Sequence, residues 1–532
     1  MRPQDRERIQ VEVVTRVVDR YVAEARRAPD GHLETLINDT LYHERRRLER
    51  ENRKKKSTQA QLAFYQGIQR RLRHASPRDL RALLDELATA FVAEVVGNFN
   101  ERVYQLSTRL IPSGLSVLLT AASPGRLLDP ETYRGDVSDH VQLQGEVEHA
   151  RGLLDRGTLI VVPTHLSNLD SVIMGYAAYL VGLPPLLYGA GLNLFTNPVI
   201  SYFMRNLGAY RVDRKKSATL YKDVLKEYAT CSLEMGYHNL FFPGGTRSRS
   251  GGVELKLKKG LLGTSAAAFV NNLRAGRPKP NLYVVPCTLS YKLVLEAETL
   301  IGDYLTEVGK SRYIIEDDEF SKPRRILNFL SNVVSLDAKI VVRFSEPLDI
   351  FGNRVDREGR SLDPHGRPVD PTSYVLSGGE PTHDEKRDAE YTNEVADEVV
   401  RAFLRDNVVM STHLVAQALF GMLRRGNPEL DLYRILATGG QTPSFSMQEL
   451  YLETDRLIAT LKALPGGPRL AEELLSGDAQ DVVGDALKHF AIYHTHAAAV
   501  RRGDRVFLED RNLLLYYGNR LNGYDLGRRR SA

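Results

Sequence analysis

A histidine and an aspartate follow a short apolar run in the stretch Leu159-Ile-Val-Val-Pro-Thr-His-Leu-Ser-Asn-Leu-Asp170. The run 159–162 predicts a buried strand that stops at Pro163, and the pattern after Asp170 is helical. On an ideal helix His165 and Asp170 would be about 140° apart, so they cannot share a helical face. With His165 at the strand's end and Asp170 in the first turn of the next helix, the two side chains meet across the loop. That geometry predicts a histidine base held by a carboxylate.

A loop suited to binding an anion is predicted in Phe242-Pro-Gly-Gly-Thr-Arg-Ser-Arg249. Its two glycines let the backbone approach an anion closely, Arg247 and Arg249 supply charge-assisted donors, and the Ser248 hydroxyl adds another. The stretch matches neither a Walker loop nor a dinucleotide fingerprint. It is therefore interpreted as a phosphate cradle, with a Gly-rich surface turn as the alternative.

Further basic residues flank this loop. Arg214 ends the segment Gly208-Ala-Tyr-Arg-Val-Asp-Arg214, where alternate side chains of an extended chain lie on opposite faces, and we predict that Arg214 serves the site. Lys256, Lys258 and Lys259 follow the glycine-rich loop. They either line a basic floor of the same site or are solvated surface lysines.

The composition is that of a globular protein, with 532 residues, 42% hydrophobic and 26% charged, which is enough chain for two or three domains. The two cysteines, Cys231 and Cys287, give no disulfide framework, and no spaced Cys/His set predicts a metal site. No Gly-x-Ser-x-Gly or His-Glu-x-x-His motif occurs. The groups that remain are a histidine base, its aspartate partner and an anion-binding loop. They favour direct attack by a substrate hydroxyl on an activated acyl group, without a covalent enzyme intermediate.

The net charge of +5 is mild, but basic residues concentrate in segment 43–56. This segment is either a solvated helix face or a surface that attracts anionic lipid or an acidic carrier protein. Nucleic acid is not predicted as a partner, because no binding motif is recognisable and tryptophan is absent. A charged N-terminus without an apolar signal region predicts a cytoplasmic location, and the prolines and asparagines within 171–204 exclude an unbroken membrane-spanning helix there.

Helical periodicity fills the first part of the chain, including a helix start at Ser76-Pro77. Strand-like runs then alternate with helical stretches, which predicts an α/β fold with a central mixed sheet flanked by helices. The predicted divisions are a helical N-terminal domain (1–140), an α/β core (141–350), a loop insertion rich in Gly and Pro (351–390) and a helical C-terminal region (391–532).

Four segments of the core, in order, resemble the blocks of the glycerolipid acyltransferase family: His165-Leu-Ser-Asn-Leu-Asp170, Gly208-Ala-Tyr-Arg-Val-Asp-Arg214, Phe242-Pro-Gly-Gly-Thr-Arg-Ser-Arg249 and Val284-Val-Pro-Cys-Thr-Leu-Ser-Tyr291. The third and fourth look closest to the bacterial glycerol-3-phosphate acyltransferases. One departure stands out, because the third block usually has glutamate where this chain has Gly244.

The resemblance implies roles for individual residues. His165 would take the proton of the acceptor hydroxyl, and Asp170 would orient its imidazole and stabilise the imidazolium. The acceptor phosphate would be held by Arg214, Arg247, Ser248 and Arg249, with Gly245 allowing close approach. Glu254 or another acid would replace the glutamate missing at position 244.

The implied function is transfer of a fatty acyl chain from acyl-CoA or acyl-carrier protein to the sn-1 hydroxyl of glycerol 3-phosphate in phospholipid biosynthesis. The alternatives are sn-2 acylation of 1-acylglycerol 3-phosphate (lysophosphatidate) and a non-catalytic lipid- or carrier-binding relative. No cofactor is expected beyond the acyl donor as co-substrate. The expected location is peripheral (monotopic), on the anionic inner face of the cell membrane.

Overall fold

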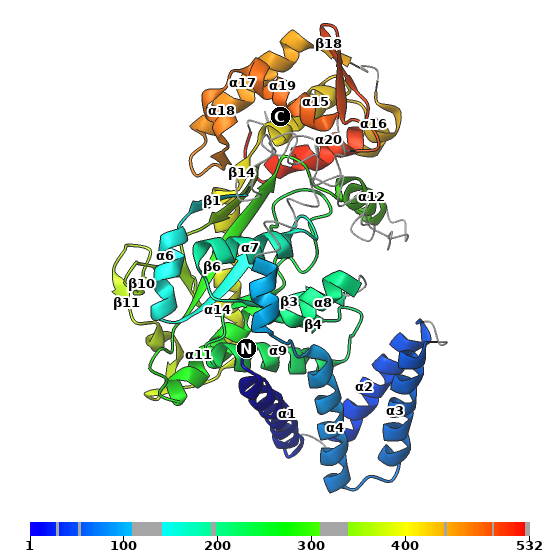
Figure 1. Ribbon diagram of the computed structural model, residues 1–532, viewed down its shortest axis with the longest axis vertical. Coiled ribbons are helices and arrows are strands. Elements are labelled where there is room, and N and C mark those ends of the chain that lie inside the picture. Colours follow the sequence, from blue (N-terminus) through cyan, green and yellow to red (C-terminus); the bar gives the residue numbers. More distant parts are fainter. Residues whose placement is uncertain are drawn as a thin grey trace.

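The computed structural model describes residues 1–27, 31–51, 55–108, 141–192, 198–308, 339–440, 444–491 and 494–526, with the backbone alone for 198–200. Residues 109–140, at the end of the predicted N-terminal domain, lie outside these ranges. In Figure 1 the N-terminal helices lie at one end of the molecule and the C-terminal helices at the other, with the central sheet between them.

The N-terminal helices are α1 (Pro3–Ala25), α2 (His32–Glu49), α3 (Lys56–Leu72) and α4 (Pro77–Val95). Helix α4 begins where the sequence predicts, because Ser76 and Asp79 cap it reciprocally through their side chains and backbone amides. The apolar faces of α1–α4 share one core with α9 (Thr219–Glu234). The N-terminal helices are therefore packed directly onto the core domain.

The central sheet confirms the predicted α/β class with a mixed sheet flanked by helices. Its main path runs in the order β11-β10-β9-β8-β6-β2-β5-β3-β4, and β7 joins β6 to β1. The strands of the core are β1 (Val141–Gly145), β2 (Thr158–Pro163), β3 (Leu187–Gly191), β4 (Ala209–Val212), β5 (Asn239–Leu240), β6 (Leu282–Tyr291), β7 (Ile340–Phe344) and β8 (Leu348–Asp349).

Strand β2 is the buried centre of this sheet. Leu159 and Val161 belong to the core on one face, whereas Ile160 and Val162 belong to the core on the other, as the period of two requires. Helices on both faces supply the covering side chains. They are α6 (Val147–Gly152), α7 (Asp170–Val181), α8 (Pro198–Asn206), α10 (Lys259–Leu262), α11 (Thr264–Arg274), α12 (Ala297–Val308) and α14 (Glu385–Asp406).

Strands β2, β5, β3 and β4 are neighbours and all run parallel. The carboxyl ends of parallel strands open at one edge of the sheet, where open α/β sheets commonly bind ligands. The loops that follow β2, β4 and β5 begin at Thr164, Asp213 and Phe241, so the predicted chemical residues of three separate segments emerge at this edge.

Segment 351–390 is not the unbroken loop that the sequence predicted. Strands β9 (Arg354–Val355), β10 (Ser361–Leu362) and β11 (Pro368–Val369) extend the central sheet, β12 (Leu376–Ser377) pairs with β13 (Glu380–Pro381), and α14 begins at Glu385. The pattern Asp-x-x-Gly-Arg occurs twice, and Asp356 and Asp363 each accept two backbone N–H groups to close a turn. This repeat of turn residues was the sequence signal for the short strands.

The C-terminal region is mostly helical but also contains strands that the sequence did not predict. A three-stranded sheet forms from β15 (Ser444–Ser446), β18 (Arg505–Leu508) and β17 (Ala499–Arg502), and β14 (Val408–Val409) pairs with β16 (Arg469–Leu470). The helices are α15 (Ser411–Arg425), α16 (Leu432–Thr438), α17 (Met447–Ala463), α18 (Glu472–Ser476), α19 (Ala479–Phe490) and α20 (Arg511–Gly518). Among the described residues, no helix is both long enough and apolar enough to cross a membrane.

Candidate active site

His165 and Asp170 meet across the loop that joins β2 to α7. His165 lies two residues beyond the end of the strand, Asp170 is the first residue of the helix, and Nδ1 of the histidine is 2.9 Å from Oδ2 of the aspartate. An ionised carboxylate can only accept, so Nδ1 carries the proton in this pair. The other ring nitrogen, Nε2, is then the basic atom of the neutral imidazole.

Asp170 is fully buried and held by a complete set of donors. Its Oδ2 accepts from the backbone N–H of Leu166 (2.6 Å) and of Ser167 (2.9 Å), and its Oδ1 accepts from the Tyr291 hydroxyl (2.5 Å). Donors on both oxygens fix the orientation of the carboxylate. The carboxylate is thereby rigid enough to orient the imidazole of His165.

His165 is itself held on several sides. Its ring stacks on Phe242, with centroids 4.1 Å apart and planes 22° from parallel. Its backbone N–H donates to Oε1 of Glu254 (2.7 Å), and its carbonyl accepts from the N–H of Ser248 (2.7 Å). The segment containing the glycine-rich loop therefore fixes the position of the histidine as well as supplying arginines.

The pKa of His165 is lowered from its ordinary value. Burial is the largest cause, the hydrogen bond and charge of Asp170 oppose it, and the cations Arg247 and Arg214 lower it further. Burial and the two nearby cations both disfavour the imidazolium form. The imidazole is therefore neutral, and able to accept a proton, at pH 7.

Arg214 and Arg247 are brought to the same edge of the sheet as His165. Arg214 follows β4 and Arg247 follows β5, and each lowers the pKa of the histidine. The pKa of Arg214 is in turn lowered, first by burial and then by the charge of Arg247. Within the described residues, no hydrogen bond or ion pair engages the Arg214 guanidinium. Two mutually repelling cations beside a neutral base are a suitable receptor for a phosphate group.

Glu296, which was not among the predicted site residues, links Arg247 to the loop that carries His165. Its carboxylate is fully buried, lies 3.2 Å from NH1 of Arg247, and accepts from the Ser167 hydroxyl (2.7 Å) and the Asn168 N–H (3.0 Å). Tyr291 ends both the fourth block and β6, and Glu296 lies five residues beyond it. The available signal was their place at or just after the end of that block.

The glycine-rich loop has the backbone that its glycines allow. Gly245 has φ of 75°, and a Cβ there would lie 2.7 Å from Cγ of Lys258, so a side chain at this position is excluded on two grounds. Gly244 has no such backbone restriction. A Cβ on Gly244 would instead meet Cγ of Glu254 at 3.1 Å, in a space that the Glu254 side chain already fills.

Two predicted phosphate ligands, Ser248 and Arg249, are bound to other groups of the protein. The Ser248 hydroxyl donates to the carbonyl of Gly252 (2.7 Å), which leaves it no proton for an anion. The guanidinium of Arg249 forms an ion pair with Glu307 of α12 (2.6 Å). In this arrangement both side chains already have partners of their own.

The three predicted floor lysines are exposed and divide between two surroundings. Lys258 lies against Gly245, beside the loop. Lys259 donates to the side chain of Asn393 on α14 (2.5 Å), which turns it toward that helix. Lys256 is exposed, and of the three lysines Lys258 is the one with a contact to the glycine-rich loop.

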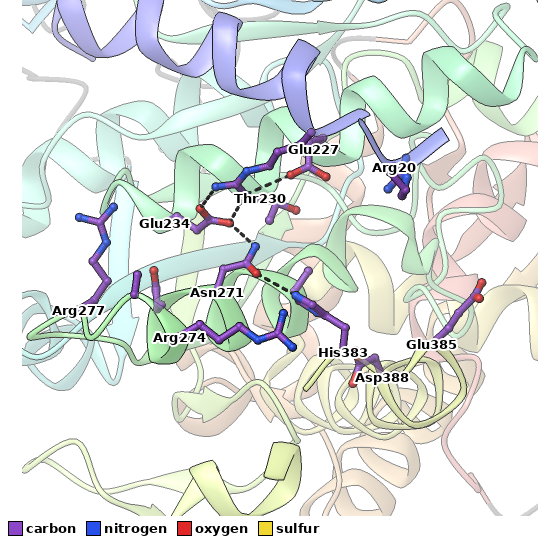
Figure 2. Close-up of a pocket in the computed structure, with 14 residues that line it drawn as sticks. Arg20, Glu227, Thr230, Glu234, Asn271, Arg274, Arg277, His383, Glu385 and Asp388 are labelled. Carbon is purple, nitrogen blue, oxygen red and sulfur yellow. Dashed lines mark hydrogen bonds and ion pairs between the residues drawn. The ribbon is translucent and has the colours of Figure 1, made fainter. Parts of the chain in front are cut away.

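A separate pocket of about 850 Å³ lies away from these residues, between α1, α9, α11 and the start of α14 (Figure 2). Its lining includes Glu227, Glu234, Asn271 and His383, but none of the predicted site residues. Hydrogen bonds and ion pairs cross it between neighbouring elements. In the ranges that the structure describes, no group of three or more His, Cys, Asp or Glu side chains could hold a metal ion.

Comparison with known proteins identifies the segment that contains this site. Residues 141–290 match the family model described as Acyltransferase. Glycerol-3-phosphate acyltransferases of Pseudomonas entomophila (strain L48) and Pseudomonas aeruginosa (strain LESB58) are each 26% identical over 376 residues, which is 70% of this chain and 39% of theirs. That of Pseudomonas putida (strain W619) is 28% identical over 207 residues, 39% of this chain and 23% of its own.

Among solved structures, the 1-acyl-sn-glycerophosphate (LPA) acyltransferase from Thermotoga maritima matches at 16% identity with a TM-score of 0.26, covering 56% of this chain and 81% of that one. The matches to the first curated relatives span about two fifths of those relatives' length. The family model covers the His165 loop, the Arg214 segment, the glycine-rich loop and almost all of β6. Residues 141–290 therefore match an acyltransferase domain, and the chain is similar in sequence to glycerol-3-phosphate acyltransferases.

Proposed function

We propose that the protein transfers a fatty acyl group from acyl-CoA or acyl-carrier protein to the sn-1 hydroxyl of glycerol 3-phosphate, with His165 as the general base. The observation that carries the proposal is the neutral imidazole, fixed by Asp170 at one nitrogen and set beside the cations of Arg214 and Arg247. The names of the curated relatives support glycerol 3-phosphate as the acceptor.

The proposed reaction needs one base and one anion site. Nε2 of His165 takes the hydroxyl proton as the oxygen attacks the thioester carbonyl carbon. The carbon–sulfur bond then breaks, and the imidazolium returns the proton to the leaving thiolate. Asp170 stabilises the imidazolium between these steps, as a buried carboxylate paired with a histidine does. Arg214 and Arg247 hold the phosphate, which places the hydroxyl near the base and lowers the entropic cost of the encounter.

Direct transfer agrees with the state of the two thiols. Cys231 and Cys287 are both buried, and burial raises the pKa of each thiol well above its ordinary value. A buried protonated thiol is a poor nucleophile. We therefore propose no covalent enzyme intermediate, and no cofactor beyond the acyl donor as co-substrate.

The acceptor is tested by competition. Purified protein with an acyl-CoA donor is expected to acylate glycerol 3-phosphate at the sn-1 hydroxyl, and excess lysophosphatidate is expected to compete weakly. Radiolabelled acyl products separated by chromatography measure both reactions. Rapid acylation of lysophosphatidate with none of glycerol 3-phosphate would replace the proposal with sn-2 acylation. Absence of transfer with acyl-CoA and with acyl-carrier protein would favour a non-catalytic relative.

We further propose that the protein acts in the cytoplasm, at the anionic inner face of the membrane. In the basic segment 43–56, Arg45 and Arg47 are bound to Gln69 and Glu44, whereas exposed side chains remain available to an anionic surface or an acidic carrier. These are Arg50, Lys55 and Lys56. The acceptor assay run with zwitterionic and with anionic vesicles tests this proposal, since equal binding and activity on both would contradict it.

The acid limb of the pH profile is expected to respond to Arg214. A cation beside an imidazole lowers its pKa, so Arg214→Gln should raise the pKa of His165. Protonation inactivates a general base, and the limb of kcat/KM on the acid side should therefore move to higher pH. Profiles at saturating acyl-CoA measure this shift.

Arg81→Gln is the matched control for that profile. Arg81 is an exposed arginine that pairs with Asp19 between α1 and α4, far along the chain from the site. The Arg81→Gln variant should leave the acid limb of the pH profile where it is in the wild type. A limb that moves to lower pH in Arg214→Gln would contradict the assigned proximity of Arg214 to His165.

A further inference from the structure

The loop between β4 and α9 carries Arg214 and is bound to the N-terminal helices. Two residues after Arg214, Lys216 is 5% exposed, with its Nζ 2.9 Å from Oε2 of Glu44 and 2.6 Å from Oε2 of Glu94. Glu44 belongs to α2 and Glu94 to α4. One buried ammonium thus joins the loop of the core domain to two N-terminal helices.

The surroundings of Lys216 keep the ammonium in one place. Its Nζ lies 4.6 Å from the centre of the Phe91 ring and 5.2 Å from that of Tyr221. Glu44, which is fully buried, also accepts from Arg47. A buried charge is tolerated only where it is paired, so Lys216 is confined to the position at which these carboxylates meet it.

Other contacts hold the backbone on either side of Arg214. The N–H of Asp213 donates to the Tyr221 hydroxyl (2.8 Å), and the Asp213 side chain accepts from the N–H of Lys215 (2.9 Å). Ser217 is hydrogen-bonded to Nδ1 of His43 on α2 (2.9 Å). The loop is therefore fixed on either side of Arg214.

We propose that the N-terminal helices position the phosphate-binding arginine, and that Lys216 is the positioning residue through which they act. This inference rests on the proposed role of Arg214 in binding the acceptor phosphate. It gives α2 and α4 a function beyond packing. Displacing a charge-assisted, directional donor weakens binding of the phosphate without altering the base, so the expected defect is in KM for the acceptor and not in kcat.

A second ion pair between the same helices and the core provides a matched control. Arg16 of α1 lies 2.7 Å from Oε1 of Glu234, the last residue of α9, and 3.3 Å from Oε1 of Glu227 in the middle of that helix. Glu234 is separated from the start of α9 by about 22 Å of helix. Arg16→Met therefore weakens the attachment of the N-terminal helices without touching the Arg214 loop.

The experiment compares Lys216→Met, Lys216→Arg, Glu94→Gln and Arg16→Met in the full chain, with glycerol 3-phosphate varied at saturating acyl-CoA. Lys216→Met is expected to raise KM about tenfold, a change of about 1.4 kcal/mol, and to leave kcat within about twofold. Lys216→Arg retains the cation and should recover most of the affinity. Arg16→Met should lower Tm without changing KM.

Two further measurements separate positioning from general damage. Amide hydrogen exchange of residues 213–217 should speed up in Lys216→Met and stay unchanged in Arg16→Met. Lys216→Met combined with Arg214→Ala should be no worse in KM than Arg214→Ala alone, because the first change acts only through the second residue. Glu94→Gln, whose side chain is partly exposed, covers the case in which Lys216→Met does not fold.

The outcomes distinguish this inference from the proposed function. If Arg214→Ala raises KM but Lys216→Met and Glu94→Gln do not, or if exchange of residues 213–217 is unchanged, the positioning role is overturned while the function stands. If Arg214→Ala leaves KM unchanged, the phosphate assignment fails, and the inference fails with it.

If the wild type transfers no acyl group, the proposed function fails. Thermal stabilisation by inorganic phosphate, lost in Lys216→Met but retained in Arg16→Met, then supports the positioning role, and its retention in both overturns it.

Discussion

Replacing His165 with alanine is expected to lower kcat for acyl transfer by about 10²–10⁴-fold, the usual contribution of a positioned general base. The bond of Nδ1 to Asp170 leaves Nε2 as the ring nitrogen that can accept the proton, and alanine removes it. Binding of glycerol 3-phosphate should change much less, since Arg214 and Arg247 remain. Initial rates with saturating donor and acceptor measure the effect.

The control for this substitution is another buried histidine. His149 has the same exposed fraction as His165, 9%, and its Nε2 is hydrogen-bonded to the carbonyl of Asp356. His149→Ala removes a side chain of equal size outside the site, so it should lower Tm and leave kcat within about twofold of the wild type. If His165→Ala retained kcat to the same degree, the assignment of His165 as general base would be wrong.

The His165–Asp170 pair was predictable because both partners lie in one short segment. A strand ending at Pro163 and a helix beginning at Asp170 leave a loop that can fold in few ways, and local pattern was enough to define both ends. The shared edge of the sheet followed from the strand order, since parallel neighbours bring the residues after β4 and β5 to the same side as His165.

The partners of the individual polar groups were not predictable in the same way. Arg249 pairs with Glu307, Asp170 accepts from Tyr291, and Arg247 meets Glu296, each across a long separation in sequence. Composition shows that arginines and carboxylates are present, but packing of α12 and β6 against the loops decides which of them meet. Ser248 and Arg249 therefore already have other partners, whereas Arg214 and Arg247 act on the pKa of His165, and the phosphate role of all four stays a prediction.

Short strands were missed for a related reason. The strands in 351–390 and in the C-terminal region have two to four residues each, too few for a periodic pattern to be distinguished from a loop. Their turns carried more information than the strands themselves, since Asp356 and Asp363 stand at equivalent positions of a repeated turn.

Exchanging the carboxylate between positions 244 and 254 is the second prediction with a large expected effect. The resemblance places a glutamate where this chain has Gly244, and the structure places the Glu254 side chain in the space that a residue at 244 would enter. Oε1 of Glu254 accepts the backbone N–H of His165 (2.7 Å). We infer that Glu254 supplies from the far side of the loop the carboxylate that the family supplies from position 244.

Glu254→Ala and Gly244→Glu should each lower activity, for opposite reasons. Glu254→Ala leaves the His165 N–H without its acceptor, a loss of about 1–3 kcal/mol that corresponds to about 5–160-fold in kcat/KM if it is expressed in the transition state. Gly244→Glu alone forces a second side chain against Glu254, since a Cβ at 244 already meets Cγ at 3.1 Å and Oε1 at 3.3 Å. It should lower both Tm and activity.

Glu254→Gln separates geometry from charge. Burial raises the pKa of Glu254 to about 7, so near that pH the carboxyl is already about half protonated, and its role as acceptor cannot depend on a full negative charge. An amide oxygen can also accept from the His165 N–H. Glu254→Gln should therefore keep most of kcat/KM, whereas Glu254→Ala should not.

The double substitution decides the inference. Gly244→Glu combined with Glu254→Ala removes the clash and returns a carboxylate to the same space, so kcat/KM should recover above either single variant. In a double-mutant cycle this appears as a favourable coupling between positions 244 and 254, of the size seen for residues in direct contact, about 0.5–3 kcal/mol. If the losses in kcat/KM of the two single variants simply add in the double variant, Glu254 does not replace a carboxylate at position 244. The bond to His165 would then be a structural contact of this chain alone, and Gly244 would be unrelated to it.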